Sequence, residues 1–363
     1  MRVLQIVAAD RWTGAAATAL QLAEALRGAD VDCDIAFRPG NNLAERLAGV
    51  PWCHPLLAKE RSLAGVRRAI AIVRKLAAGC DVVHAHLPHD HALARLALAV
   101  PPPALVRSIH HPRHLRRDPF QRWLMGETVA LGLTNSTMAP AARRTGGRPF
   151  AVLPIALEER FLAVATAPTS RRAGIRASRR AALGVPADAI VAGSVGKLDC
   201  GRSQDLLLHA LAAAPGIWGL VIGHGPKDEA LRRLARRLGV AERVAWTGYV
   251  DDGLEEHYLA MDLFVFPAAG SDWAHRALAE AAACGVPALA ADLAGVRDLV
   301  EPGATGDIFP AEDAAALAVL LRRWSTDPAL RERAGAAAAA RAIREWTPAR
   351  LAAAALDLYR QVL

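Results

Sequence analysis

The sequence has few cysteines, few aromatic residues and no long apolar run. Its 363 residues include 5 cysteines, without a Cys-x-x-Cys pair or a zinc-like spacing with histidine. This argues against a disulfide framework or a zinc site and favours free thiols in a reducing compartment. No apolar stretch of about 18 residues occurs, and the apolar run at the N-terminus is too short for a signal peptide. We therefore expect a soluble, cytoplasmic protein that is at most peripheral to a membrane.

Aromatic residues make up 5% of the chain, and no basic segment is interleaved with them as in proteins that bind single-stranded nucleic acid. A nucleic-acid partner is therefore not expected. The net charge of +8 nevertheless indicates anionic partners, such as phosphate groups or an acidic membrane. Much of this charge comes from arginines scattered over alanine-rich segments, so a merely solvated surface explains it equally well.

Strand-like and helix-like segments alternate along both halves of the chain. The first half begins with the apolar run RVLQIVAA and a helical spacing of apolar residues, and the alternation restarts at AIVAGSVG. This alternation of strand-like and helix-like segments predicts parallel strands joined by crossover helices. A length of 363 residues suits two domains, each with its own hydrophobic core. We therefore predict an α/β fold of two doubly wound, Rossmann-like parallel-sheet domains that face each other across a cleft.

The predicted domain boundaries follow from changes in composition. We expect a first domain at 1–162, a linker at 163–186 and a second domain at 187–346. The linker prediction rests on a segment with Pro, Thr, Ser and clustered Arg but no strand pattern, and we expect the linker to end in a short basic helix.

The C-terminal segment 347–363 has the pattern of a helix. Thr347 before Pro348 suits a helix start, and apolar residues then recur at helical spacing. We expect this helix to cross back to the first domain. A helix packed on the second domain is the alternative.

Candidate polar residues follow several predicted strands of the second half. Lys197 and Arg202 could clamp a diphosphate at the end of a strand, or they are two surface cations. Gly223 and Gly225 would let the backbone approach a ligand, although a glycine-rich turn before a helix is also common topology. Ligands of open parallel sheets bind beyond the carboxyl ends of the strands, which favours this region as a site.

Two acids, Asp272 and Glu280, flank a predicted helix start with seven residues between them. Asp272 could cap the helix and Glu280 could be a solvated charge. Alternatively, both carboxylates face a sugar.

Taken together, these segments resemble the retaining family 4 glycosyltransferases, group 1, of the GT-B fold. The resemblance is carried by the order and spacing of SVGKLDCGRSQD, LVIGHGP, WTGYV, SDWAHRALAEAAACGVPALAAD and GVRDLVEPGATGDIFP, and it spans almost the whole chain. It implies that Lys197 and Arg202 hold the diphosphate of a nucleotide-sugar donor. It also implies that Glu280 binds the ribose hydroxyls and that Asp272 lies beside the donor sugar.

The resemblance places further donor contacts in both halves. Tyr249 and Val250 would border the base through backbone groups. The run Trp273, Ala274 and His275 would offer backbone amides to phosphate. In the first half, DVVHAHLPHDHA resembles a family segment whose histidine faces the donor sugar, which points to His86, and Gly14 matches part of a glycine-rich first loop.

The implied function is retaining transfer of a sugar from UDP-sugar or GDP-sugar to an acceptor hydroxyl. A glycan or a lipid-linked molecule would be the acceptor, in the synthesis of cell-surface polysaccharide, glycolipid or a related glycoconjugate. No cofactor and no metal are expected, because cations stand where the diphosphate would bind and no acidic cluster ends a strand.

The sequence departs from the family pattern at several positions. The first loop reads RWTGAAA instead of a Gly-Gly-x-Glu type sequence, position 272 is Asp instead of Glu, and WAH replaces a small Gly-Phe-Gly-like run at 273–275. These departures favour the alternative function, a non-catalytic relative that binds a nucleotide sugar with a degenerate site.

A basic and aromatic segment of the first half suggests contact with an anionic membrane at its inner face. It groups Arg113, Arg116, Arg117 and Arg122 with Phe120, Trp123 and Leu124. Basic residues near an anionic leaflet contribute about 1 kcal/mol each. A solvated loop with a buried Trp is the alternative.

Overall fold

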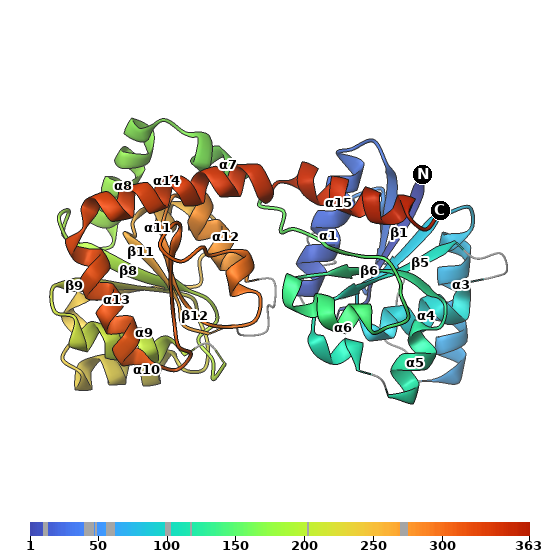
Figure 1. Cartoon of the computed structure of the whole chain (residues 1–363), viewed down its shortest axis with the longest axis horizontal. Coiled ribbons are helices and arrows are strands. Elements are labelled where there is room, and N and C mark those ends of the chain that lie inside the picture. Colours follow the sequence, from blue (N-terminus) through green and yellow to red (C-terminus); the bar gives the residue numbers. More distant parts are fainter. Residues whose placement is uncertain are drawn as a thin grey trace. The chain divides into compact units, whose positions relative to one another are not determined.

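The structure, a computed structural model, describes residues 1–9, 14–39, 47, 49–55, 62–98, 103–116, 118–201, 203–268 and 275–363. The described residues form two compact α/β units (Figure 1). The first unit contains Met1–Ala156 and Thr347–Leu363, and the second contains residues between Leu157 and Trp346. Among the described helices, none is both long and apolar enough to cross a membrane.

The first unit is built on a parallel sheet of order β3-β2-β1-β4-β5-β6-β7. Its strands are β1 (Arg2–Val7), β2 (Asp32–Phe37), β3 (Cys53–His54), β4 (Val82–Ala85), β5 (Ala104–Ile109), β6 (Thr128–Leu133) and β7 (Phe150–Val152). Its helices are α1 (Gly14–Arg27), α3 (Leu63–Ala77), α4 (Pro88–Ala97), α5 (Pro119–Met125), α6 (Ala139–Arg143) and α15 (Pro348–Arg360), with the short 3-10 turns η1 (Pro112–Leu115) and η2 (Ser136–Met138). Helices α1 and α15 cover one face of the sheet, and α3 and α4 cover the other (Figure 1).

The second unit is built on a parallel sheet of order β10-β9-β8-β11-β12-β13. Its strands are β8 (Ile190–Val195), β9 (Ile217–Ile222), β10 (Val244–Gly248), β11 (Leu263–Phe266), β12 (Ala288–Ala291) and β13 (Gly306–Phe309). Its helices are α7 (Glu159–Thr166), α8 (Thr169–Ala182), α9 (Gln204–Ala213), α10 (Asp228–Arg237), α11 (Leu254–Leu259), α12 (Arg276–Ala283), α13 (Ala314–Thr326) and α14 (Pro328–Glu345), with the 3-10 turns η3 (Ala241–Arg243) and η4 (Val296–Asp298). Both sheets are the doubly wound, Rossmann-like sheets that the alternation predicts.

Helix α15 is part of the first unit although it ends the chain. Thr347 caps it, because its side chain accepts a hydrogen bond from the Arg350 backbone amide. Leu351 and Leu358 are buried in a cluster with Leu22 of α1. Fully burying a leucine side chain contributes about 1.5 to 3 kcal/mol, so this apolar stripe attaches the C-terminal segment to the first unit.

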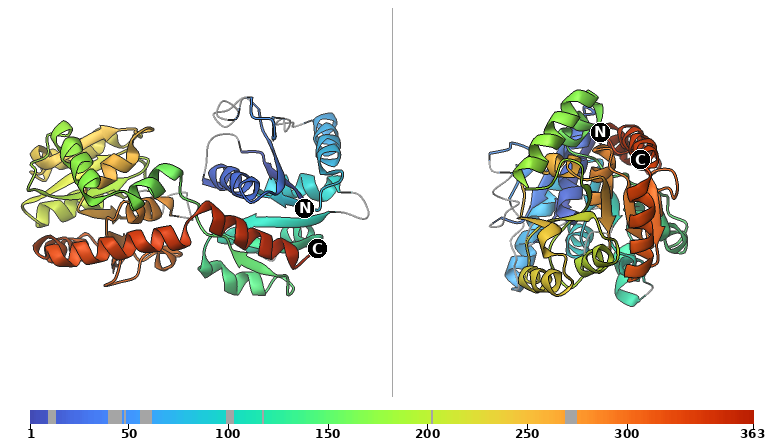
Figure 2. Two further views of the ribbon diagram at one scale, coloured as in Figure 1. Left: turned by 90° about the horizontal axis from the view of Figure 1, so that it is seen from above. Right: turned by 90° about the vertical axis from the view of Figure 1, so that its left-hand side faces the viewer.

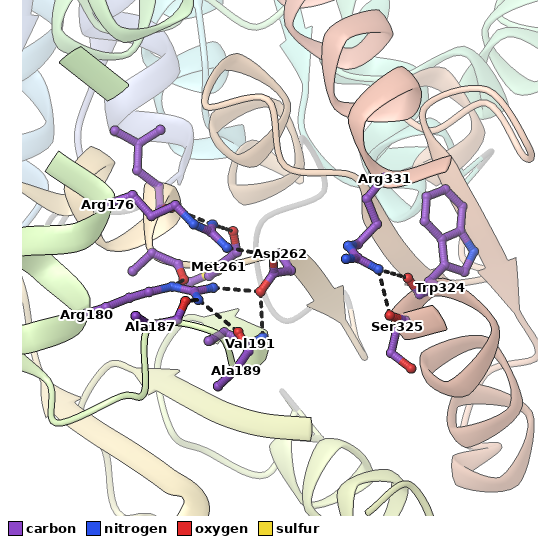
Figure 3. Close-up of polar contacts among 12 residues, drawn as sticks. Arg176, Arg180, Ala187, Ala189, Val191, Met261, Asp262, Trp324, Ser325 and Arg331 are labelled. Atoms are coloured by element: carbon purple, nitrogen blue, oxygen red, sulfur yellow. Dashed lines mark hydrogen bonds and ion pairs between the residues drawn. The ribbon is translucent and has the colours of Figure 1, made fainter. Parts of the chain in front are cut away.

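Residues 163–186 differ from the linker that the sequence suggests. They form most of helices α7 and α8, and the boundary between the units follows Ala156. Arg176 and Arg180 of α8 each approach a different carboxylate oxygen of Asp262 at 2.6 Å (Figure 3). The short basic helix expected in this segment is therefore present as α8, but its arginines fasten it to the second unit instead of leaving it in a linker.

Candidate functional site

Both sheets have a point where the strand order reverses, and the candidate residues follow the strands at these points. In the second unit the order reverses between β8 and β11, which are neighbours. In the first unit it reverses between β1 and β4. Open parallel sheets bind ligands at the carboxyl ends of the strands beside such a reversal. Each unit therefore has one edge at which a ligand is expected.

The loops after β8 and β9 lie against each other, backbone to backbone. The Leu198 amide donates to the His224 carbonyl at 3.1 Å. A Cβ at Gly223 would lie 1.9 Å from the Gly196 oxygen, and one at Gly225 would lie 2.2 Å from the Leu198 oxygen. Only glycine fits at both positions. The neighbouring loop alone therefore requires glycine at both positions, and the contact of these glycines with a ligand stays a prediction.

Lys197 lies in this pair of loops and reaches into solvent. Its side chain is 58% exposed, with Nζ 3.6 Å from Asp199 Oδ2. The Lys197 carbonyl accepts a hydrogen bond from Gln204 Nε2 at 3.2 Å, which fixes the backbone that carries the cation. The position suits an anion at the end of β8. Arg202, the predicted second cation, lies outside the described residues.

The third loop of this edge carries the predicted base contacts. Tyr249 and Val250 follow β10, and the Gly248 carbonyl accepts from the Gly223 amide at 2.8 Å. The loops after β8, β9 and β10 are thus joined by backbone hydrogen bonds. The Tyr249 ring is 71% exposed, and its hydroxyl lies 3.3 Å from Asp251 Oδ1. An exposed ring next to a rigid loop could border a base.

Glu280 lies inside the second unit instead of on its surface. It is on α12, and the Tyr258 hydroxyl of α11 donates to its Oε2 at 2.9 Å. Burial raises the pKa of Glu280, although Arg276 and the Tyr258 hydrogen bond oppose this shift. The solvated-charge alternative is therefore wrong. Tyr258 orients the carboxylate, and no pattern in the sequence predicts it because the pair depends on a contact between two helices.

His275 begins α12 in a left-handed backbone conformation, with φ at 53°. Its buried ring donates from Nε2 to the Ala294 carbonyl at 2.8 Å. This contact ties the start of the helix to the chain after β12. A non-glycine residue with such a backbone is strained, and strain of this kind gathers at functional sites. Asp272, Trp273 and Ala274 lie outside the described residues.

In the first unit, His86 follows β4 and is fully buried. Its Nε2 lies 2.8 Å from Gln5 Oε1, and its ring stacks on that of His84 at 4.8 Å. Burial lowers the pKa of His84 to about 3 and the pKa of His86 well below its ordinary value. Both rings are therefore neutral at physiological pH. Gly14, the other candidate of this unit, is the first residue of α1.

Two family models match consecutive parts of the chain. The model described as Glycosyltransferase Family 4 matches residues 12–182, and the model described as Glycosyl transferases group 1 matches residues 176–341. The chain belongs to the group 1, family 4 glycosyltransferases. Within the described residues of this glycosyltransferase, no group of three His, Cys, Asp or Glu side chains has the arrangement of a metal site.

Curated relatives match about half of the chain. A D-inositol 3-phosphate glycosyltransferase from Streptomyces bingchenggensis is 34% identical over 208 residues, which are 53% of this chain and 45% of that protein. The enzyme of the same name from Geodermatophilus obscurus is 37% identical over 182 residues, 45% of this chain and 40% of that protein. The chain thus spans about half the length of the curated relatives it matches.

Solved structures share the fold along the whole chain. HepE of Anabaena, solved in complex with UDP, aligns with a TM-score of 0.86 at 20% identity and covers 100% of both chains. The sucrose-phosphate synthase of Thermosynechococcus elongatus aligns with a TM-score of 0.74 at 20% identity, over 100% of this chain and 99% of that chain. The fold of this glycosyltransferase is GT-B, as the resemblance implied.

Proposed function

We propose that this glycosyltransferase moves a sugar from UDP-sugar or GDP-sugar to an acceptor hydroxyl with retention of configuration. The observation that carries the proposal is the pair Glu280 and Lys197 at the reversal of the second sheet. One is a buried carboxylate on α12 oriented by Tyr258, and the other is an exposed cation in the loop after β8, the strand beside β11. A carboxylate suits ribose hydroxyls and a cation suits a diphosphate, so together they fit the two ends of a nucleoside diphosphate.

In the proposed reaction, the bond between the donor sugar and the diphosphate breaks while the acceptor oxygen attacks from the same face. Lys197, Arg202 and the amides at the start of α12 would stabilise the charge that develops on the departing diphosphate. Asp272 and His86 would contact the donor sugar. Because protein cations would meet the diphosphate, we propose that the reaction needs no metal ion.

The relatives guide the choice of donor and acceptor. HepE has been solved with UDP-glucose, so a UDP-sugar is the first donor to test here. For the acceptor we propose a glycan or a lipid-linked molecule in the synthesis of cell-surface glycoconjugates, inside the cell.

The structure also favours a membrane-facing surface on the first unit. Phe120 and Trp123 of α5 are 55% and 40% exposed, and their rings stack at 6.0 Å. Beside them, Arg116, Arg122 and Arg144 help to line an open pocket. The sequence alternative of a buried Trp is therefore wrong. Exposed aromatic rings next to arginines suit an anionic leaflet, and we propose reversible contact with the inner face of the membrane. Arg117 lies outside the described residues.

Vesicle sedimentation tests this contact. The protein should sediment with vesicles of phosphatidylglycerol but not with neutral phosphatidylcholine, and high salt should release it. Phe120→Ser together with Arg122→Ser should abolish sedimentation, whereas Arg233→Ser on α10 should not. Equal binding to both vesicle types, or to neither, contradicts the proposal.

Calorimetry and a turnover assay test the main proposal. UDP or GDP should bind the full chain, and the matching nucleotide sugar should be consumed with release of the nucleoside diphosphate. Binding without any transfer or hydrolysis would support the non-catalytic alternative. No binding of UDP, GDP or ADP would overturn both.

A further inference from the structure

A chain of buried polar side chains crosses the interior of the first unit and ends at His86. Ser108 Oγ lies 2.9 Å from His84 Nε2, and His84 Nδ1 lies 2.6 Å from the Tyr359 hydroxyl. Gln5 Nε2 donates to that hydroxyl at 3.3 Å, and Gln5 Oε1 lies 2.8 Å from His86 Nε2. All five side chains are at most 2% exposed. Strands β1, β4 and β5 thus share one polar network with the C-terminal helix α15.

The orientation of the Gln5 amide in the structure sets the direction of each hydrogen bond. An amide nitrogen only donates, so Gln5 Nε2 donates to the Tyr359 oxygen. The Tyr359 proton then goes to His84 Nδ1, which leaves His84 Nε2–H to donate to Ser108. At the other end, Gln5 Oε1 only accepts, so His86 must donate from Nε2. These hydrogen positions are assigned so that every hydrogen bond of the network has one donor and one acceptor.

His86 is therefore neutral with its proton on Nε2, and its Nδ1 is a bare acceptor. Nδ1 is buried and has no hydrogen-bond partner among the described residues. Buried acceptors are seldom left unpaired, and an exception calls for an explanation. His110, whose ring centre lies 5.7 Å from that of His86, follows the neighbouring strand at the same edge.

We infer that Gln5 and Tyr359 are positioning residues that hold His86 in the Nε2–H form, so that Nδ1 is kept as the acceptor for a hydroxyl of the donor sugar. Turning the Gln5 amide would reverse every hydrogen bond of this network and would put the His86 proton on Nδ1, so the orientation of the Gln5 amide sets the tautomer of His86. The sugar contact rests on the proposed function, whereas the protonation of His86 does not. Since Nδ1 is buried, the donor must displace what covers it.

Nitrogen-15 NMR of the histidine rings in the full chain tests the inference directly. The wild-type spectrum should show His86 protonated on Nε2 and bare on Nδ1. Gln5→Met removes the acceptor and should shift His86 toward the Nδ1–H form, whereas Gln5→Glu keeps an acceptor and should preserve Nε2–H. Ser108→Ala, at the opposite end of the hydrogen-bond network from His86, is the matched control and should leave the protonation of His86 unchanged. A wild-type His86 protonated on Nδ1 overturns the inference even if every variant fails to fold.

The same variants separate this inference from the proposed function. With a donor that the wild type consumes, Gln5→Met and Tyr359→Phe should lower kcat/KM at least tenfold, while the affinity for UDP stays unchanged. Gln5→Glu should restore part of the rate and move the pH profile upward, since a carboxylate favours a protonated imidazole. If the wild type consumes no nucleotide sugar, the proposed function fails while the NMR result still decides the tautomer. Equal losses of rate and UDP affinity would mean that Gln5 is merely structural.

Discussion

The two units differ in the polar groups that they bury most often, although the first also buries Asp90 and Arg107. The first unit holds neutral histidines that bond to neutral partners, as with His84 and Tyr359 or His91 and Thr128. The second unit holds charges against charges, as with Arg180 and Asp262 at 2.6 Å (Figure 3). Neutral groups are cheaper to bury but must stay unprotonated, whereas an ion pair has a desolvation cost even when intact and destabilises the fold most when one partner is missing.

The second unit exposes a cation, Lys197, and buries a carboxylate, Glu280. The first unit buries neutral hydrogen-bonding side chains around His84 and His86. Figure 2 shows each unit from two further sides, with α15 running along the sheet of the first unit. That helix supplies Tyr359 to the neutral network.

Breaking the ion pair of the second unit should have the largest effect on stability. In Asp262→Ala, Arg180 stays 3% exposed without its partner, and the Val191 amide loses its acceptor at 2.7 Å. Breaking a buried pair costs about 3 to 5 kcal/mol. Urea unfolding measures the loss. Asp292→Ala, which breaks the exposed pair with Arg297, is the control and should change little; equal losses would contradict the comparison.

Mild acid should destabilise the first unit before the second. Burial lowers the pKa of His84, His91 and His114 to about 3, so the unfolded chain binds more protons as the pH falls below about 6.5. Stability is then complete above this pH and declines below it, by up to about 1.4 kcal/mol per pH unit for each histidine.

Pulse proteolysis at pH 7.5 and 5.5, with the fragments identified by mass spectrometry, shows which unit opens first. The same cause lowers the pKa of His257 in the second unit, so that unit should weaken too, but less. If the second unit opens first at pH 5.5, the neutral histidines do not set the acid sensitivity.

Glu280→Gln should weaken nucleotide binding and at the same time stabilise the fold at pH 7. We expect nucleotide binding to weaken by about 1 to 3 kcal/mol, because a charged hydrogen bond is lost. Because burial raises the pKa of Glu280, its ionisation opposes folding increasingly as the pH rises above about 4.3, the ordinary pKa of glutamate, and fully above the raised pKa. The variant should therefore be more stable than the wild type at pH 7, and this gain should vanish near pH 4. Calorimetry and urea unfolding measure the two effects. Glu229→Gln, in an exposed pair, is the control, and unchanged nucleotide affinity in Glu280→Gln would reject the assignment.

Lys197→Ala should have the smallest effect on binding free energy and the clearest difference between UDP and UMP. Because the side chain is 58% exposed, its contact with a diphosphate should contribute only about 1 kcal/mol. The loss should appear for UDP and be much smaller for UMP, which lacks the second phosphate. Calorimetry with both nucleotides measures it, and Lys75→Ala, an exposed lysine in the last turn of α3 in the first unit, is the control. Losses of the same size for UDP and UMP would argue against a diphosphate contact.

Local patterns in the sequence were enough to predict much of the fold. The Thr347–Pro348 start and the apolar stripe behind it predict a helix, and α15 lies there. Alternating strands and helices predict both sheets. The prediction that residues 163–186 link the two units was wrong because the sequence does not show which residue pairs with a cluster of arginines. Their partner Asp262 lies 82 positions from Arg180.

The candidate site could be predicted only in part, for the same reason. Lys197, His86 and Glu280 stand at strand ends or on the helix that follows, where the alternation and the family resemblance point. Their supporting residues are joined to them only by the fold: Tyr359 and Gln5 are 354 positions apart, and Tyr258 reaches Glu280 from another helix. No local pattern marks such pairs.

Hydrogen exchange of the full chain with and without UDP tests the central claim most directly. The account predicts that UDP slows exchange in the loops after β8, β9 and β10 and at the start of α12, and that Glu280→Gln reduces this protection at the same UDP concentration. Protection of these segments would place the nucleotide on the edge where Lys197 and Glu280 stand. Protection confined to the first unit, or no protection at saturating UDP, would contradict the account.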